Sequence, residues 1–317
     1  MTKEFLVPLP KTASPQKTLK NRIKCSGIGL HSGARISMVL HPAAPDTGIV
    51  FRRTDLAGNP VIRARHDRVN DTRLCTSIAE NGASVATVEH LMAAFAGTGV
   101  DNVLVELDGP EVPVMDGSSA PFVFLLECAD LIDQAAPRRY LKVLKPVTVV
   151  DGDRSAGLYP ASQFSVGFSI NFENPVVGEQ IVDFTLSDGS FKAELARART
   201  FGFAHEVDQL REMGLARGGS LDNAVVVSGD RVLNDDGLRY QDEFVRHKAL
   251  DAIGDLYMAG SPLLARYEGD RSGHALNNQL LLKLFADKSA WTYVTKMPVR
   301  ATVSRRREQE ESAYATA

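Results

Sequence analysis

The chain is poor in cysteine, in charge of one sign and in long apolar runs, and each shortage argues against a class of protein. Its three cysteines among 317 residues, Cys25, Cys75 and Cys128, are widely spaced and form no C-x-x-C pair. This argues against a disulfide framework and a thiolate zinc site, and predicts a reducing, cytoplasmic location. The formal net charge of -3 argues against a nucleic-acid partner. Because no stretch approaches the roughly 18 apolar residues of a membrane span, we expect no transmembrane segment, while contact with a membrane surface stays open.

The first half of the chain has strand patterns and two helix patterns. Residues 19–53 read as short strands separated by Gly and Pro, and residues 103–107 alternate apolar and polar side chains as a further strand. Between them, the sequence predicts a helix capped by Thr87 and ended by Gly97. A second helix is expected from about Ser119.

The second half repeats this order of strands followed by helices. Beyond a predicted linker at 133–139, strand patterns precede helix patterns near residue 190 and at 205–213, 242–257 and 276–287. The repeat favours an internal duplication and the α+β class, with two similarly built two-layer domains of sheet packed by helices. We expect an N-terminal α+β domain at 1–135, a C-terminal α+β domain at 139–300 and a disordered tail at 304–317.

Residues 242–256, DEFVRHKALDAIGDL, predict a helix with reactive side chains on one face. Its small and apolar residues recur every three or four positions, which predicts one buried side. His247 and Asp251 lie on the opposite side, one turn apart, with Asp255 a further turn along. An imidazole and a carboxylate at this spacing can reach one cation from the same side.

A second histidine completes a metal-binding set. His90, His247 and Asp251 together have the composition of a catalytic zinc site, which keeps a fourth position for water. Glu89, next to His90, would then be the general base toward that water, whose pKa zinc lowers from about 16 to about 7. The alternative is two unrelated structural histidines. The same donors would also accept ferrous iron.

Five segments carry more specific motifs. They are TVEHLMAAFAGTGVDNVLVELDGPEVPVMDGSSAPFV (87–123), RARTFGF (197–203), LDNAVVV (221–227), DEFVRHKALDAIGDL (242–256) and GHALNN (273–278). In order and spacing they resemble the UDP-3-O-acyl-N-acetylglucosamine deacetylases, the zinc amidases of bacterial lipid A synthesis. The resemblance runs from about residue 18 to 297.

The resemblance implies the fold, the reaction and the partners. It implies an active site between two α+β domains, with zinc as the cofactor. It also implies removal of acetate from a small-molecule UDP-acyl-sugar, UDP-3-O-[(R)-3-hydroxyacyl]-N-acetylglucosamine, in the committed step of lipid A synthesis. We expect such an enzyme to be a monomer.

The resemblance also implies catalytic roles. It implies zinc ligands at His90, His247 and Asp251, a base at Glu89, and at His274 the group that protonates the departing amine. Taken from the residues alone, the alternative for His274 is a helix cap beside Gly273.

Three further positions match residues that assist the reaction. Asp255 matches the partner that orients His274, and Thr200 matches a hydroxyl that helps to hold the tetrahedral oxygen. Lys248 matches a lysine that contacts the substrate.

Five positions match substrate contacts or the surroundings of the metal. Phe172, Phe201 and Arg271 match residues that contact the sugar or UDP. Arg154 stands where a lysine is expected at the diphosphate, which keeps the charge but changes the geometry. The resemblance places Cys75 near the metal, where the alternative is a small buried hydrophobe, and we do not assign it as a ligand.

The acyl chain of such a substrate needs an apolar groove. An insert near 203–227 offers Phe203, Leu210, Met213, Leu215 and Leu221 around a short helix. In the family this insert forms the acyl passage. The alternative from sequence alone is an amphipathic helix packed on the core.

Two other classes of function stay open on the sequence. One is a non-catalytic module that binds a nucleotide sugar or nucleic acid, which would need neither a stoichiometric metal nor Glu89. The other is a metal hydrolase that acts on a different N-acyl substrate, in which Phe172 and Arg271 would not bind a nucleotide.

Overall fold

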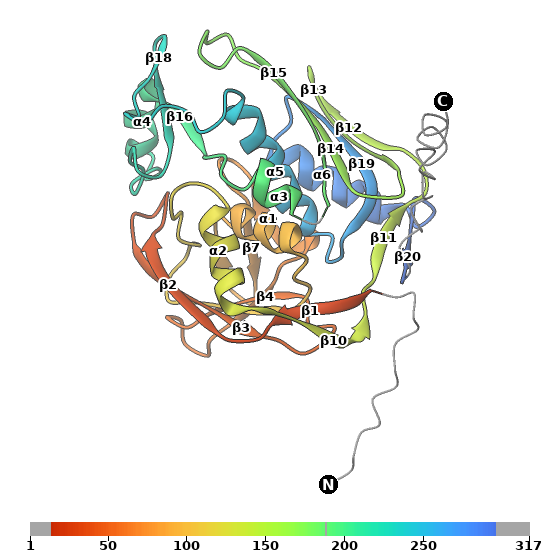
Figure 1. Ribbon diagram of the computed structural model, residues 1–317. Helices are drawn as coiled ribbons and strands as arrows, with labels where there is room; N and C mark the ends of the chain where they lie inside the picture. The colour runs from red at the N-terminus through yellow and green to blue at the C-terminus, as the bar shows by residue number, and fades with distance from the viewer. Residues whose placement is uncertain (1–13, 188, 296–317) are drawn as a thin grey trace, which may run out of the picture.

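Helices and strands are mixed throughout the computed structural model, which describes residues 14–187 and 189–295 (Figure 1). The α+β class is therefore confirmed. The tail predicted at 304–317 lies outside the described residues. No helix within them is both long and apolar enough to cross a membrane.

The first half contains a five-stranded sheet beneath two helices. The strand order is β2 (Ile23–Ile28), β3 (Arg35–Pro42), β9 (Val103–Leu107), β4 (Ile49–Arg53) and β5 (Val61–Arg63). Alternate residues of β3 are buried, as half-buried strands require. Helices α1 (Glu89–Thr98) and α2 (Ala120–Ala129) lie above this sheet in Figure 1.

Shorter elements complete the first half. They are a pair formed by β1 (Pro15–Leu19) and β10 (Leu131–Pro137), the 3-10 helix η1 (His66–Arg68), and a three-stranded sheet of β6 (Val69–Asp71), β7 (Ser77–Glu80) and β8 (Ala83–Val85).

The second half contains a seven-stranded sheet with helices beside it. Its strands are β11 (Tyr140–Val143), β12 (Val147–Asp151), β13 (Arg154–Pro160), β14 (Ser165–Asn171), β15 (Glu179–Thr185), β19 (Leu263–Asp270) and β20 (Trp291–Val294). The helices are α3 (Ser190–Glu194), α5 (Glu243–Tyr257) and α6 (His274–Ala286).

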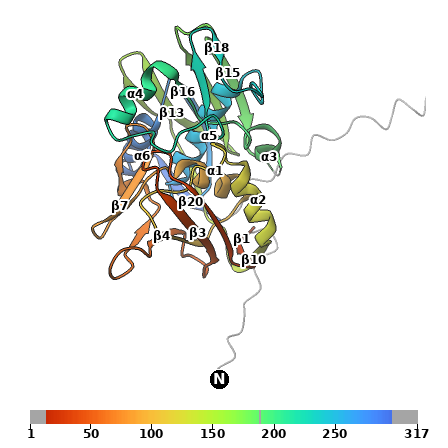
Figure 2. The ribbon, with the colours of Figure 1, turned by 90° about the vertical axis from the view of Figure 1, so that its left-hand side faces the viewer.

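A small subdomain projects from the second half, at the upper left of Figure 1 and along the top of Figure 2. It consists of β16 (Phe201–Phe203), β17 (Val225–Ser228), β18 (Arg231–Val232) and α4 (Ala204–Glu212). It therefore occupies the insert that the sequence places near 203–227.

The two halves meet through helices α1 and α5, which lie between the sheets (Figures 1 and 2). The helices come so close that a Cβ added at Gly254 would stand 2.0 Å from the carbonyl oxygen of Glu89. Every described strand from Pro15 to Pro137 pairs within its own half, as does every described strand from Tyr140 to Val294. The α1–α5 contact is thus where residues of both halves can form one site.

The ends of α1 differ from the sequence prediction. Thr87 does not cap the helix, because its hydroxyl donates to Glu111 at 2.8 Å. The helix ends at Gly99, whose φ of 73° is left-handed, and not at Gly97. Gly97 is needed for packing instead, since a Cβ there would lie 2.2 Å from the ring of Phe191.

The predicted linker is also wrong for most of its length. Residues 133–137 belong to β10, which pairs antiparallel with β1. Arg138 then binds Asp101 through its side chain, so the crossing between the halves is short and fixed. The domain limits of 1–135 and 139–300 stay a prediction.

Candidate metal centre and active site

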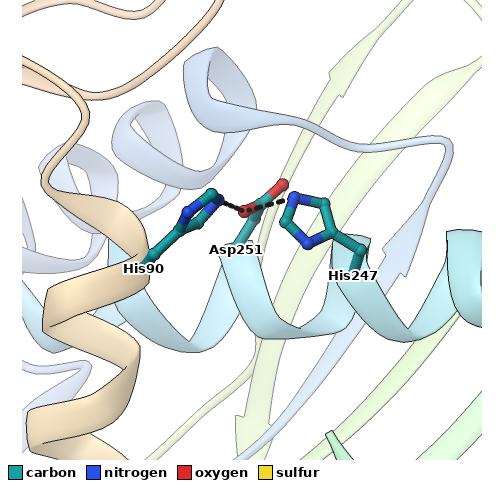
Figure 3. Close-up of side chains that lie close together, drawn as sticks. All are labelled: His90, His247 and Asp251. Atoms are coloured by element: carbon teal, nitrogen blue, oxygen red, sulfur yellow. Dashed lines mark ion pairs between the residues drawn. The ribbon is translucent and has the colours of Figure 1, made fainter. Parts of the chain in front are cut away.

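Three side chains from the two halves converge at the α1–α5 contact (Figure 3). His90 comes from α1, and His247 and Asp251 come from one face of α5. The Nε2 atoms of His90 and His247 lie 3.5 and 3.4 Å from Asp251 Oδ1, and all three side chains are buried. The structure thus brings together the set that the sequence proposes as metal ligands.

The positions of these donor atoms suit coordination of a small cation better than direct hydrogen bonds between the side chains. The two Nε2 atoms lie 3.4 to 3.5 Å from Asp251 Oδ1, which exceeds the usual N–H···O distance of about 2.9 Å, and all three ligand atoms lie within 4.8 Å of one another. Asp251 Oδ1 and His90 Nδ1 are buried and have no hydrogen-bond partner among the described residues. Two donors at roughly 2.1 Å from a tetrahedral zinc ion would lie roughly 3.4 Å apart. The residues present therefore fit zinc.

The protonation states of His247 and Asp251 also suit a metal site. His247 Nδ1 donates to the carbonyl oxygen of Ala198 at 3.0 Å, which leaves the lone pair of Nε2 facing Asp251. Burial lowers the pKa of His247 to about 4, so this imidazole is neutral near pH 7. Burial would raise the pKa of Asp251, but His247 and His90 hold it well below its usual value. The site therefore offers a carboxylate beside a neutral ring.

Glu89 lies next to this centre at the first position of α1. Its Oε2 accepts a hydrogen bond from the backbone N–H of Thr76 at 3.0 Å, and its Oε1 lies 4.0 Å from Nε2 of His274. Burial raises the pKa of Glu89 to about 7. A carboxyl group with this pKa can both accept and return a proton near neutral pH.

His274 begins helix α6 and binds Asp255. Its Nδ1 donates to Asp255 Oδ2 at 2.8 Å. Burial alone would lower the pKa of His274, but the carboxylate of Asp255 raises it to about 9. The ring is therefore a proton donor near neutral pH. The alternative of a helix cap does not hold, because Gly273 occupies the cap and the imidazole binds a different helix.

A cavity of about 160 Å³ opens onto these groups. Besides the proposed ligands, Glu89 and His274, it is lined by Leu30, Leu74, Phe172, Thr200, Phe201 and Lys248. The ammonium of Lys248 lies 3.6 Å from Asp251 Oδ2. The structure thus places Thr200, Lys248, Phe172 and Phe201 around one small space with the acid, the base and the metal ligands.

Three of the predicted contact residues lie outside this lining. Arg271 binds Asp153, and Arg154 binds Asp151. The two aspartates lie at the tip of the β12–β13 hairpin. Cys75 is buried, and burial raises the pKa of its thiol to about 12. Within the described residues, the group suited to a metal does not include it.

A second cavity, of about 400 Å³, adjoins the first under helix α4. It shares Leu30, Leu74, Thr200 and Phe201 with the first cavity, and it is also lined by Phe203, Val207, Leu210, Leu221, Ala224 and Val226. Met213 and Leu215 are not part of this lining. The alternative of a helix packed on the core is wrong, because none of the described side chains of α4 is buried.

Sequence reasoning missed the residues that hold Asp255. Thr76 donates its hydroxyl to Asp255 Oδ1 at 2.5 Å, and Asn277 donates its amide to Oδ2 at 2.8 Å. Asn277 in turn accepts hydrogen bonds from Tyr267 and Ser272. Asn277 follows His274 by three positions, so its place on the same helix face was a usable signal. No local pattern points from Thr76 to Asp255.

Known proteins resemble the chain over both halves. The family model of UDP-3-O-acyl N-acetylglycosamine deacetylase matches residues 16–286. A UDP-3-O-acyl-N-acetylglucosamine deacetylase of Acidithiobacillus ferrooxidans is 53% identical over 291 residues, which cover 91% of this chain and 96% of the relative. Proteins of the same name from Saccharophagus degradans and Xanthomonas oryzae pv. oryzae are each 51% identical over 284 residues, covering 88% of this chain and 93% of the relative.

Proposed function

The chain belongs to the UDP-3-O-acyl N-acetylglycosamine deacetylase family, and we propose that it removes acetate from UDP-3-O-[(R)-3-hydroxyacyl]-N-acetylglucosamine in the committed step of lipid A synthesis. One observation carries this proposal beyond the family match. His90, His247 and Asp251 meet beside Glu89 and His274 around a single cavity. This arrangement suits hydrolysis of an amide, which needs a base, an acid and a cation.

We propose zinc as the cofactor, held by His90, His247 and Asp251. When bound there, zinc makes water acidic enough to ionise near neutral pH and polarises the amide carbonyl. Ferrous iron remains the alternative metal, since two imidazoles and a carboxylate accept either ion.

Glu89 is the proposed general base. The N–H of Thr76 holds one of its oxygens, so the other can receive the proton of the attacking water. Its raised pKa brings its proton affinity close to the working pH, where general bases are most effective.

His274 is the proposed acid for the departing amine. An amine leaves an amide only when its nitrogen is protonated, and His274 carries a proton near neutral pH. Asp255 fixes the ring through Nδ1, which directs Nε2 toward Glu89 and the cavity. Thr200 and Lys248 line the same space, where a hydroxyl and a cation can stabilise the charge that develops on the carbonyl oxygen.

The adjoining cavity of about 400 Å³ is the proposed site of the acyl chain. Its apolar lining would remove such a chain from water at a gain of about 25 cal/mol per Å². We place the sugar and UDP against Phe172 and Phe201, with Arg271 and Arg154 toward the phosphates. The two arginines need to exchange their present carboxylate partners for phosphate oxygens.

We further propose that one chain is sufficient for activity, as a cytoplasmic monomer acting on a small-molecule substrate. Support for this comes from the site itself, because one chain supplies the three proposed ligands, the base and the acid.

The test is an assay of purified protein with the UDP-acyl-sugar. Acetate and a free amine should appear in equal amounts, a chelator should stop the reaction, and zinc should restore it. Glu89→Gln should keep the metal but lose about 10² to 10⁴ in rate, as should His274→Ala. As a matched control, His41→Gln removes a histidine that binds Glu106 on the first sheet and should leave the rate unchanged. Undiminished turnover by the Glu89 variant or by the chelated enzyme would overturn the proposal.

A further inference from the structure

Among the described residues, Thr76 is the one that donates hydrogen bonds to the carboxylates of both Glu89 and Asp255. Its backbone N–H donates to Glu89 Oε2 at 3.0 Å, and its hydroxyl donates to Asp255 Oδ1 at 2.5 Å. Its carbonyl oxygen accepts from the N–H of Val88 at 3.2 Å. The side chain is buried, with 2% of the residue exposed. All the polar groups of Thr76 therefore form hydrogen bonds with α1, with its N-cap residue Val88 or with α5.

The carboxylates of Glu89 and Asp255 have different roles in the proposed reaction. Glu89 moves a proton itself, whereas Asp255 acts through His274. Thr76 sits on a loop before β7 that belongs to neither helix. Thr76 thus connects the proposed base, Glu89, to Asp255, the residue that orients the proposed acid, His274.

We propose that Thr76 is a positioning residue that fixes Glu89 and the Asp255–His274 pair relative to each other. This rests on the proposed function. Asp255 Oδ2 serves both His274 and Asn277, while Thr76 is the only donor in the described residues to Oδ1. Without the hydroxyl, Oδ1 is a buried acceptor with no donor, and the carboxylate is free to rotate about its last bond. His274 then loses the fixed direction in which it delivers its proton.

Thr76→Val separates the two contacts, because it removes the hydroxyl but keeps the backbone N–H. We expect kcat to fall roughly tenfold to a hundredfold, the range expected for one hydrogen bond to a charged group, with KM within about twofold. Thr76→Ser keeps a hydroxyl and should restore kcat to within about threefold. Zinc content should not change, since Thr76 contacts none of the proposed ligands.

Thr18→Val is the matched control. Thr18 is 3% exposed, and its hydroxyl donates to Asn102 O and accepts from the N–H of Ala43. It lies in β1, away from the cavity. Both valine variants should lower the melting temperature, but only Thr76→Val should lower kcat. The positioning role of Thr76 would be wrong if the two variants had equal kcat, or if Thr76→Val raised KM and left kcat unchanged.

A double variant tests the route through His274. In the His274→Ala background, Thr76→Val should cost less than about twofold further, because the group it positions is gone. If Thr76→Val lowers kcat in this background as much as it does in the unaltered enzyme, Thr76 does not act through His274, and this part of the proposal is wrong.

An NMR readout keeps this test separate from the test of the proposed function. The Nδ1 proton of His274, hydrogen-bonded to Asp255, should shift in Thr76→Val and stay in place in Thr18→Val, with no substrate present. A wild-type enzyme that releases no acetate would refute the proposed function alone. An unmoved Nδ1 proton would refute the role of Thr76 alone.

Discussion

Asp251 differs from its neighbours in that it touches both histidines and a lysine. Its Oδ1 faces the two imidazoles, and its Oδ2 lies 3.6 Å from Lys248 Nζ. In the proposed site it is the only ligand with a negative charge, so it partly neutralises the dication. Its carboxylate should therefore contribute more to metal affinity than to the shape of the site.

We predict that Asp251→Asn lowers zinc affinity by at least roughly a hundredfold while the fold is kept, because the amide has the same size but no charge. Competition with a chromophoric zinc chelator measures the affinity, and circular dichroism checks the fold. Glu89→Gln, a similar change next to His90, should bind zinc like the unaltered enzyme. Stoichiometric, tight zinc in Asp251→Asn would mean that Asp251 is not a ligand.

Sequence reasoning succeeded for residues whose positions are set by one helix. His247 and Asp251 share a face of α5 because the helical repeat fixes their directions, whatever surrounds them. Thr76 could not be found in this way, because its partner Asp255 lies 179 positions further along the chain. Only the packing of the two halves brings that pair together.

Helices α1 and α5 pack through a glycine on α5. Gly254 lies seven positions after His247, and its missing side chain admits the backbone of Glu89 and Ala93. Gly97 stands at the same distance from His90 but packs against Phe191 of α3. Each of the two helices thus carries a proposed ligand and, two turns later, a glycine where another element comes close.

Gly254→Ala should destabilise the protein by about 1 to 3 kcal/mol and reduce turnover. The added Cβ would stand 2.0 Å from Glu89 O, so α1 must move and carry the proposed base and His90 with it. Thermal unfolding and the acetate assay measure the two effects. Gly202→Ala is the control for stability, since a Cβ there meets no atom within 4 Å. An unchanged melting temperature in Gly254→Ala would show that the helices have room to separate.

At the level of elements, periodicity located α1, α2, α5 and α6 but not all of their ends. Thr87 has the chemistry of a cap, yet Glu111, 24 positions away, takes its hydroxyl. Segment 133–137 has the composition of a linker, yet β1 offers it an antiparallel partner. In both cases a hydrogen-bonding partner far away in the sequence determined the structure, and the locally preferred cap or linker did not form.

Across the whole molecule, the order of strands and helices predicted two α+β halves, but not how the strands pair. Strand β19 pairs in parallel with both β11 and β14, which precede it by about a hundred residues. Such pairings join strands of the second half that are far apart in the sequence, and a single sequence does not encode them locally. The location of the site between the halves was implied by the ligands, since His90 is remote in sequence from His247 and Asp251.

Zinc held by the proposed ligands would link the two halves, in addition to direct contacts such as the hydrogen bond from the Tyr257 hydroxyl to Val100 O. A ligand that binds only the folded protein stabilises it by RT ln(1 + [L]/Kd), about 2.7 kcal/mol at a hundredfold excess over Kd. The unfolded chain separates His90 from His247 and Asp251, so it should hold zinc far more weakly. We therefore predict that removing the metal with a chelator lowers the melting temperature, and that zinc restores it.

Differential scanning calorimetry of three proteins decides this. The unaltered enzyme and His41→Gln should show the same zinc-dependent rise, because His41 lies on the first sheet and binds Glu106. His247→Gln should show little or no rise, since a ligand from α5 is missing; it also loses the hydrogen bond from His247 Nδ1 to Ala198 O, which affects stability with and without zinc. A rise of equal size in His247→Gln would place the stabilising zinc at another site. No rise in the unaltered enzyme would mean that the metal does not join the two halves.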